Sequence, residues 1–163
     1  MDLQLKTLAK ISVCLLLFSI VSLVGCSKRD ATINVDDDDP KMLAAIAKAR
    51  ETLPQFWAKF DSPQPGEDNF CLKVKIRDGK EVEHFWAEKL EKKDGKIFGS
   101  LANDPDLVHN VKLGDRIEIP EPDISDWFYM RNDKMVGNYT MRVLFDHMSP
   151  SEVAKYKALL ADP

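Results

Sequence analysis

The sequence predicts an α+β domain in which an antiparallel β-meander packs against an N-terminal helix and two C-terminal helices. The spacing of the apolar residues and the composition of the turns support this prediction. Apolar residues recur at helical spacing over residues 42–60, alternate with polar residues over residues 70–76, and return to helical spacing after residue 140. Short turns rich in Asp, Asn and Gly separate the middle segments, which is typical of hairpins.

The composition is that of an ordinary globular protein and argues against a nucleic-acid partner. The chain has 163 residues, of which 44% are hydrophobic and 31% charged, and its formal net charge is −4. Affinity for a phosphate backbone comes mainly from clustered Lys and Arg, and the sequence contains no basic stripe. We therefore expect no nucleic acid among its partners.

Residues 1–25 have the pattern of a lipoprotein signal peptide. Two lysines precede an apolar run over residues 11–23, which is too short for a comfortable membrane-spanning helix. The run ends in Leu23-Val24-Gly25-Cys26, which resembles the lipobox of bacterial lipoproteins. The alternative is a plain secretory signal in which Cys26 falls here by chance. The register of the apolar run, the small residue and the cysteine favours the lipobox.

Acylation of Cys26 would anchor the mature chain in a lipid bilayer. A single acyl chain binds a membrane only marginally, whereas the two or three chains of a mature lipoprotein give stable anchoring. In the lipoproteins that this motif resembles, Asp after the cysteine is associated with retention in the inner membrane, and Ser27 occupies that position here. The resemblance therefore implies a protein of the bacterial cell envelope, in the outer membrane of a host that has one and facing the periplasm. Cys71 would then have no partner for an intramolecular disulfide, and we expect it in a half-buried strand.

Residues 26–39 are predicted to be the lipidated cysteine and an acidic flexible tether, followed by a single globular domain over residues 40–163. The tether ends in four aspartates, which lack the glycine and the spaced ligands of a calcium loop, so we interpret them as a self-repelling linker. Asp39 and Pro40 have the residue types of an N-cap and a first helical position.

One apolar stripe predicts the first helix. Spacings of three and four residues place its members on a single face: Met42, Ile46, Ala49, Leu53, Phe56 and Phe60. Pro54 lacks the N–H for its i−4 hydrogen bond, so we expect a kink near Thr52. Two prolines and a glycine in residues 62–66 end the helix.

The first hairpin can form in two registers around a turn at residues 77–79. A three-residue loop pairs Val74 with Val82 and places His84 and Trp86 on the core face. A two-residue loop instead turns His84 outward, because a slip of one residue exchanges the two faces of a strand. We favour the three-residue loop, since it buries Val82 and Trp86 together.

The remaining elements follow from turns and caps. We expect a third strand over residues 96–101, a loop from Asn103 to His109 and a fourth strand over residues 116–119. Ile124, Trp127 and Phe128 have i, i+3, i+4 spacing, which predicts a short helical turn capped by Asp123. Two C-terminal helices are expected, one from Thr140 and one from the capping box that begins at Ser149.

Several short motifs together resemble one bacterial family, catalogued as domain of unknown function 2314, which includes the YegJ-like lipoproteins. The motifs are A-x-A-R-E-T-L-P-x-F at Ala47–Phe56, E-H-F-W at Glu83–Trp86, L-x-N-x-P at Leu101–Pro105, L-G-D at Leu113–Asp115, D-I-S-D-W-x-Y at Asp123–Tyr129 and G-N-Y-T-x-R at Gly137–Arg142. The resemblance covers nearly the whole predicted domain. It implies a small bacterial domain, often secreted, and no catalytic residue that could be carried over.

The residues that could carry chemistry each have a structural alternative. Glu83 and His84 are an obvious acid–base pair, but neighbours on a strand point to opposite faces. We favour the interpretation of His84 as a hydrogen-bonded core residue. Asp115, Asp123 and Asp126 could gather as metal ligands or as a carboxylate pair. Each also occupies a position that suits a turn or a cap, and no His lies at ligand spacing, so we expect no metal and no cofactor.

Aromatic and basic residues leave similar alternatives open. Trp86, Trp127 and Tyr129 could form an aromatic binding surface or could be core residues. Arg142, close in sequence to Asn138 and Thr140, could bind a carboxylate or phosphate, or could make a structural salt bridge at a helix end. The candidate residues for binding a ligand or partner are therefore His84, Trp86, Asp115, Asp126, Trp127, Asn138 and Arg142.

The leading hypothesis is a non-enzymatic binding or interaction module, tethered to the membrane through Cys26, whose partner is an unknown protein or small molecule. The hypothesis depends on the tether, the small size and the lack of a nucleophile–base–orienter set in the sequence. The alternative is an envelope hydrolase that uses His84 with Asp115 or Asp126.

The anchor can be tested directly. Cells that produce the wild-type chain should incorporate labelled palmitate into it and should carry it in the membrane fraction. The Cys26→Ala variant should incorporate none, because the acylated thiol is gone. Equal labelling of the two proteins would contradict the lipoprotein interpretation.

Overall fold

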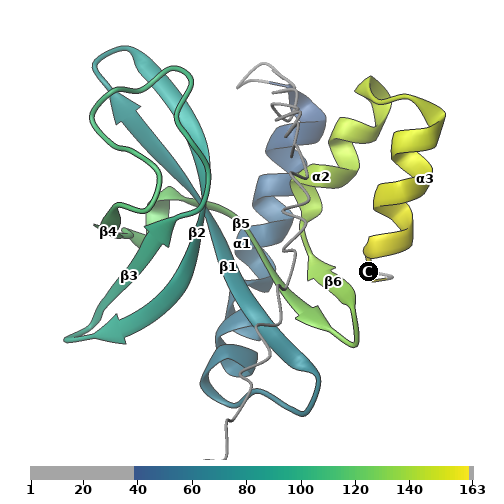
Figure 1. The fold of residues 1–163 in the computed structure, drawn as a ribbon, viewed down its shortest axis with the longest axis horizontal. Coiled ribbons are helices and arrows are strands. Elements are labelled where there is room, and N and C mark those ends of the chain that lie inside the picture. Colours follow the sequence, from purple (N-terminus) through teal and green to yellow (C-terminus); the bar gives the residue numbers. More distant parts are fainter. Residues whose placement is uncertain (1–38, 162–163) are drawn as a thin grey trace, which may run out of the picture. The chain divides into compact units, whose positions relative to one another are not determined.

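The computed structural model describes residues 39–161, which form an α+β domain as predicted. The predicted signal peptide, Cys26 and all but the last residue of the predicted tether lie outside the described residues. Six antiparallel strands form one sheet in the order β4-β3-β2-β1-β5-β6. Figure 1 shows helix α1 along the sheet, with helices α2 and α3 beside β6.

The elements follow the predicted order as far as β4 and again in the two C-terminal helices. They are α1 (Pro40–Asp61), β1 (Glu67–Asp78), β2 (Glu81–Lys93), β3 (Lys96–Leu101), β4 (Arg116–Glu118), the 3₁₀ turn η1 (Glu121–Asp123), β5 (Ile124–Arg131), β6 (Lys134–Gly137), α2 (Tyr139–Leu144), the 3₁₀ turn η2 (Phe145–His147) and α3 (Pro150–Leu159). The capping box predicted at Ser149 is present, with Glu152 as its second member.

Helix α1 begins where its cap was predicted. The Asp39 carboxylate accepts a hydrogen bond from the Met42 amide at 2.9 Å, and Pro40 occupies the first turn. The helix continues through Pro54 to Asp61. Near the proline, the Thr52 hydroxyl donates to the carbonyl of Lys48 at 2.8 Å, so this buried hydroxyl is satisfied within the helix.

The core lies between α1 and one face of the sheet, and Trp127 is its centre. Its indole is 2% exposed, and its Nε1–H donates to the Ala49 carbonyl of α1 at 2.9 Å. The ring lies 5.5 Å from Phe56 of α1 and stacks on Tyr129, with centroids 6.2 Å apart. Trp127 and Tyr129 are therefore core residues, which decides between the two alternatives left by the sequence.

The register favoured for the first hairpin is wrong. Val74 pairs with Phe85 and Lys75 with His84, across a two-residue turn at Gly79 and Lys80. The turn lies further along the chain than predicted. The side chains of the second strand point to the faces expected from the two-residue alternative. Phe85 is fully buried on the core face. His84 and Trp86, which the favoured register placed there, lie on the opposite face.

The helical turn predicted for residues 123–129 is also wrong, because this segment is strand β5. The i, i+3 spacing of Ile124 and Trp127 has another cause. Val74 pairs with Ile124 and Lys73 with Asp126, so Ser125 is an extra residue in β5. This bulge lets Ile124 and Trp127 both face the core, which imitates helical spacing.

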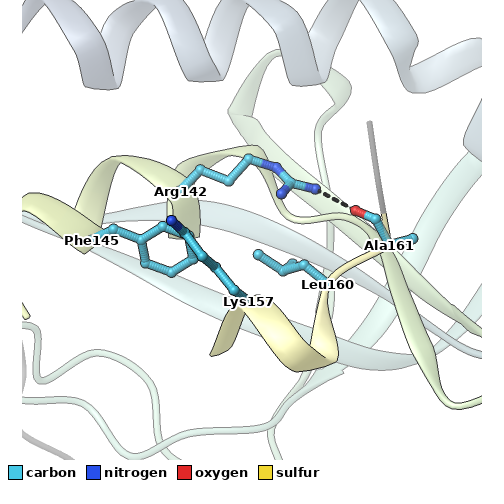
Figure 2. A pocket seen from close by; sticks show the side chains of 5 residues that line it. All are labelled: Arg142, Phe145, Lys157, Leu160 and Ala161. Atoms are coloured by element: carbon cyan, nitrogen blue, oxygen red, sulfur yellow. Dashed lines mark hydrogen bonds between the residues drawn. The ribbon is translucent and has the colours of Figure 1, made fainter. Parts of the chain in front are cut away.

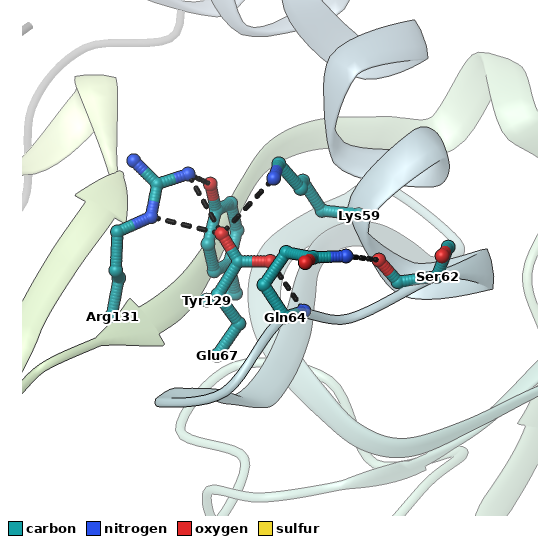
Figure 3. A network of polar contacts seen from close by, with 6 residues as sticks. All are labelled: Lys59, Ser62, Gln64, Glu67, Tyr129 and Arg131. Atoms are coloured by element: carbon teal, nitrogen blue, oxygen red, sulfur yellow. Dashed lines mark hydrogen bonds and ion pairs between the residues drawn. The ribbon is translucent and has the colours of Figure 1, made fainter.

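A buried carboxylate fastens the end of α1 to the sheet (Figure 3). The Glu67 side chain is 3% exposed and accepts a hydrogen bond from the Gln64 amide at 2.9 Å. Its other oxygen lies 2.9 Å from Arg131 Nε and 3.2 Å from Lys59 Nζ. The Gln64 amide, opposed by burial and aided by the two cations, holds the pKa of Glu67 below its usual range.

This network predicts an acid-sensitive contribution to stability. Because the pKa of Glu67 is lowered on folding, its ionised form stabilises the domain above its ordinary pKa of 4.5, and this contribution is lost as the pH falls through the folded value. The Glu67→Gln variant should therefore unfold at lower urea concentration than wild type at pH 7. The difference between the two midpoints should shrink as the pH falls below 4.5.

The exposed Glu81, also on the first hairpin, supplies the control. Glu81→Gln should shift the urea midpoint little at either pH. A difference between wild type and Glu67→Gln that is the same at pH 7 and in acid would show that the Glu67 charge makes no such contribution.

Candidate functional site

The face of the sheet that points away from α1, which we call the second face, carries three of the seven candidate residues, His84, Trp86 and Asp126. Cross-strand pairing places Trp86 and Asp126 beside Lys73, and it places His84 beside Lys75. Because partners in an antiparallel pair point to the same side, these residues share one surface. The members used below are Cys71, Lys73, His84, Trp86, Ser125, Asp126 and Phe128, with Thr140 of α2 at the border.

An aromatic pair occupies the middle of the second face. The rings of Trp86 and Phe128 meet edge to face, with centroids 4.8 Å apart, and both side chains remain partly exposed. The Lys73 ammonium lies 5.6 Å from the Trp86 ring centroid, within the range of a cation–π interaction. The result is a partly exposed aromatic surface with a cation at its edge.

Asp126 is completely buried and joins the sheet to α2. Its carboxylate accepts four hydrogen bonds, from the amides of Trp127, Tyr139 and Thr140 and from the Thr140 hydroxyl. The amide bond from Thr140 measures 2.7 Å. Burial raises the pKa of Asp126, and these hydrogen bonds oppose the rise. The role of Asp126 is thus to satisfy the first amides of α2.

Lys73 is linked to Asp126 through a shared hydroxyl. Its Nζ donates to Thr140 Oγ1 at 3.3 Å, and that hydroxyl donates to Asp126 at 2.7 Å. Burial lowers the pKa of Lys73, and the charge of Asp126 opposes the fall. Sequence reasoning missed Lys73, Phe128 and Thr140. Lys73 looked like one polar residue of an alternating strand, and only the strand pairing places it beside Asp126.

His84 is bound to the bulge of β5. Its Nδ1 lies 2.8 Å from Ser125 Oγ, and that hydroxyl donates to the Lys73 carbonyl at 3.2 Å. Ser125 is 1% exposed, so this hydroxyl has structural partners and little access to a substrate. Glu83 precedes His84 in strand β2, so its side chain points to the opposite face of the sheet, as expected. Its carboxylate accepts backbone hydrogen bonds from the loop at residues 106–108.

The other candidate residues lie away from the second face. Asp115 closes a turn by accepting a hydrogen bond from the Lys112 amide at 3.0 Å. Asn138 is 3% exposed, adopts a left-handed conformation with φ 53° and donates to Met135 Sδ. Within residues 39–161, Arg142 donates to the carbonyls of Ala161 and Gly137 rather than to a carboxylate. The structure therefore brings together His84, Trp86 and Asp126 and separates Asp115, Trp127, Asn138 and Arg142 from them.

Cys71 lies on the second face but is not reactive there. It is buried, and burial raises the pKa of its thiol to about 12, so the thiolate is scarce at neutral pH. Among residues 39–161, no cluster of three or more His, Cys, Asp or Glu side chains has the geometry to hold a metal ion. Within the same residues, no helix combines the length and apolar character needed to cross a membrane.

These features define the chain's class as a small α+β domain with one helix-covered sheet face and one partly exposed aromatic face. The chain belongs to the bacterial family DUF2314, described as an uncharacterized protein conserved in bacteria, whose family model matches residues 39–161. The family suggested by the sequence motifs is thereby confirmed.

The chain is also similar to two curated proteins. The uncharacterized protein YegJ of Escherichia coli (strain K12) is 33% identical over 131 residues, which cover 80% of this chain and 84% of that protein. A putative ankyrin repeat protein of Neisseria meningitidis serogroup B (strain ATCC BAA-335 / MC58), NMB1133/NMB1171, is 27% identical over 132 residues, or 76% of this chain and 52% of that protein. No solved structure matches the chain.

The structural role of Asp126 can be measured. Asp126→Asn keeps one acceptor oxygen but places an amide among hydrogen-bond donors, so we expect the free energy of unfolding to fall by about 2–3 kcal/mol. Urea denaturation followed by tryptophan fluorescence would measure the loss. The exposed Asp104→Asn is the control and should change stability little. Equal stabilities of the two variants would contradict the assigned role of Asp126.

Proposed function

We propose that the chain is a non-enzymatic binding module of the bacterial cell envelope, anchored through acylated Cys26 and binding its ligand on the second face. The observation that carries this proposal is the partly exposed pair of Trp86 and Phe128 with the Lys73 ammonium beside it. Large aromatic side chains beside a cation, left partly exposed in a sheet, are typical of recognition surfaces.

The geometry favours a ligand that combines a flat or apolar face with an anionic group. The rings of Trp86 and Phe128 offer area for stacking, and Lys73 offers a partly desolvated cation next to them. Such a cation is less hydrated than an exposed lysine. An anionic group that reaches it therefore has a larger electrostatic interaction energy with it. Glycan fragments that carry carboxylates have both features and are present where a periplasm-facing lipoprotein would be anchored.

The alternative function, an envelope hydrolase that uses His84 with Asp115 or Asp126, has weaker support. A general base must reach the proton that it removes, and its carboxylate partner must be available to orient it. The Asp126 carboxylate already accepts four hydrogen bonds from Trp127 and the start of α2. Asp115 is occupied in its own turn.

The proposed surface can be tested with a matched pair of tryptophan variants. Soluble peptidoglycan fragments would be titrated into the full chain carrying Cys26→Ala, with binding followed by calorimetry. We expect Trp86→Ala to weaken binding about tenfold, because it removes the stacking surface. Trp57→Ala is the control, since Trp57 also has a lysine over its ring, Lys92 at 4.4 Å, but lies on α1.

The Trp57→Ala variant should bind as the parent does. Equal weakening by both substitutions, or unchanged binding by Trp86→Ala, would contradict the assignment of the second face as the binding surface. Hydrolysis of the fragments by the parent but not by a His84→Ala variant would instead support the hydrolase.

A further inference from the structure

A second candidate site lies between α2 and α3, outside the second face. It is a cavity of about 380 Å³ lined by Arg142, Phe145, Lys157, Leu160 and Ala161. Figure 2 shows the Arg142 side chain on one side of this space, with Phe145, Lys157 and Leu160 below it. Two of the five lining residues are cations and none is acidic, so the cavity combines positive charge with an apolar floor.

Arg142 has unused capacity to donate a hydrogen bond. One terminal nitrogen donates to the Ala161 carbonyl at 3.0 Å and, at 3.5 Å, to the Gly137 carbonyl. Its Nε is buried and has no hydrogen-bond partner within residues 39–161. A buried charged donor without an acceptor is unfavourable, so a rearrangement that gives this Nε–H an acceptor would stabilise the domain. The contact to Gly137 is at the limit of hydrogen-bond distance, so the bond to Ala161 is the main contact that orients the guanidinium.

Lys157 supplies the second charge from α3. Its ammonium lies 5.8 Å from the Phe145 ring centroid, and its side chain is exposed at the rim of the cavity. Phe145 and the buried Leu160 provide the apolar wall. A volume of about 380 Å³ is within the range of pockets that hold small organic ligands.

We propose that this cavity binds a small organic anion, a carboxylate or phosphate group on a short apolar stem. The anionic oxygens accept hydrogen bonds from the Arg142 guanidinium and pair with the Lys157 ammonium. The stem packs against Phe145 and Leu160. Both anions present oxygen atoms in a geometry that a guanidinium can bind through two hydrogen bonds. This proposal does not depend on the ligand proposed for the second face.

Hexanoate and hexyl phosphate are the probes, titrated into the full chain carrying Cys26→Ala and followed by NMR of the backbone amides. We expect both probes to shift the amide signals of residues 142–161. Hexylamine and hexanol, which have the same stem without the anion, should shift them little. The anion that binds more tightly assigns the preferred group, and either preference supports the proposal.

Two lysines on α3 provide the matched test. Lys157→Gln should weaken binding of the anions about tenfold, because it removes one of the two charges. Lys155→Gln removes the same charge from the same helix, but Lys155 lies over Tyr156 rather than in the cavity, so binding should be unchanged.

Arg142→Lys tests the guanidinium while keeping the charge. We expect this variant to bind the anions at least about tenfold more weakly, since it lacks the Nε–H donor. Equal weakening by Lys155→Gln and Lys157→Gln, equal binding of hexanol and hexanoate, or absence of signal shifts in the parent would each overturn the proposal. Because Lys157 is exposed, its variant should fold even where an Arg142 substitution loosens the end of the chain.

Discussion

The close approach of Gly137 to Trp127 is the constraint on which the rest of the domain depends. Gly137 has φ 89°, and a Cβ at this position would lie 2.6 Å from the indole ring and 2.5 Å from the Trp127 carbonyl. Only glycine fits there. Because the chain passes so near, the amides of Tyr139 and Thr140 reach Asp126. The Trp127 indole also donates to the Ala49 carbonyl of α1. Two adjacent residues of β5 thus connect the sheet with α1 and α2.

Most of the family motifs have a role in this architecture. Arg50 donates to the carbonyls of Ile124 and Pro122, which fixes α1 against the start of β5. Glu83 anchors the loop that follows β3, and Asn103 accepts a hydrogen bond from the Trp86 amide. Each of these contacts joins two segments far apart in the sequence. The side chain of Trp86 is different, because its ring stays partly exposed and packs against Phe128 on the second face.

The two proposed sites share a chemical preference although they lie on different parts of the fold. The second face offers Lys73 beside two aromatic rings, and the α2–α3 cavity offers Arg142 and Lys157 beside Phe145. The chain as a whole has a net charge of −4, so these cations are local exceptions. Under the two proposals, each site would bind a single anionic group, while the net negative charge of the chain would repel a polyanion.

The sequence alone determined the elements whose signals are local. Asp39 with Pro40, the capping box at Ser149, the apolar stripe of α1 and the fold class are all recovered, because capping and periodicity act within a few residues. The tertiary structure decided the hairpin register and the bulge at Ser125. When both faces of a strand carry large side chains, the alternation of residues fits more than one register. One extra residue, as in a bulge, exchanges the faces to which the following side chains point. The partners of Lys73 follow from that register, so the second face becomes visible only once the strands are paired.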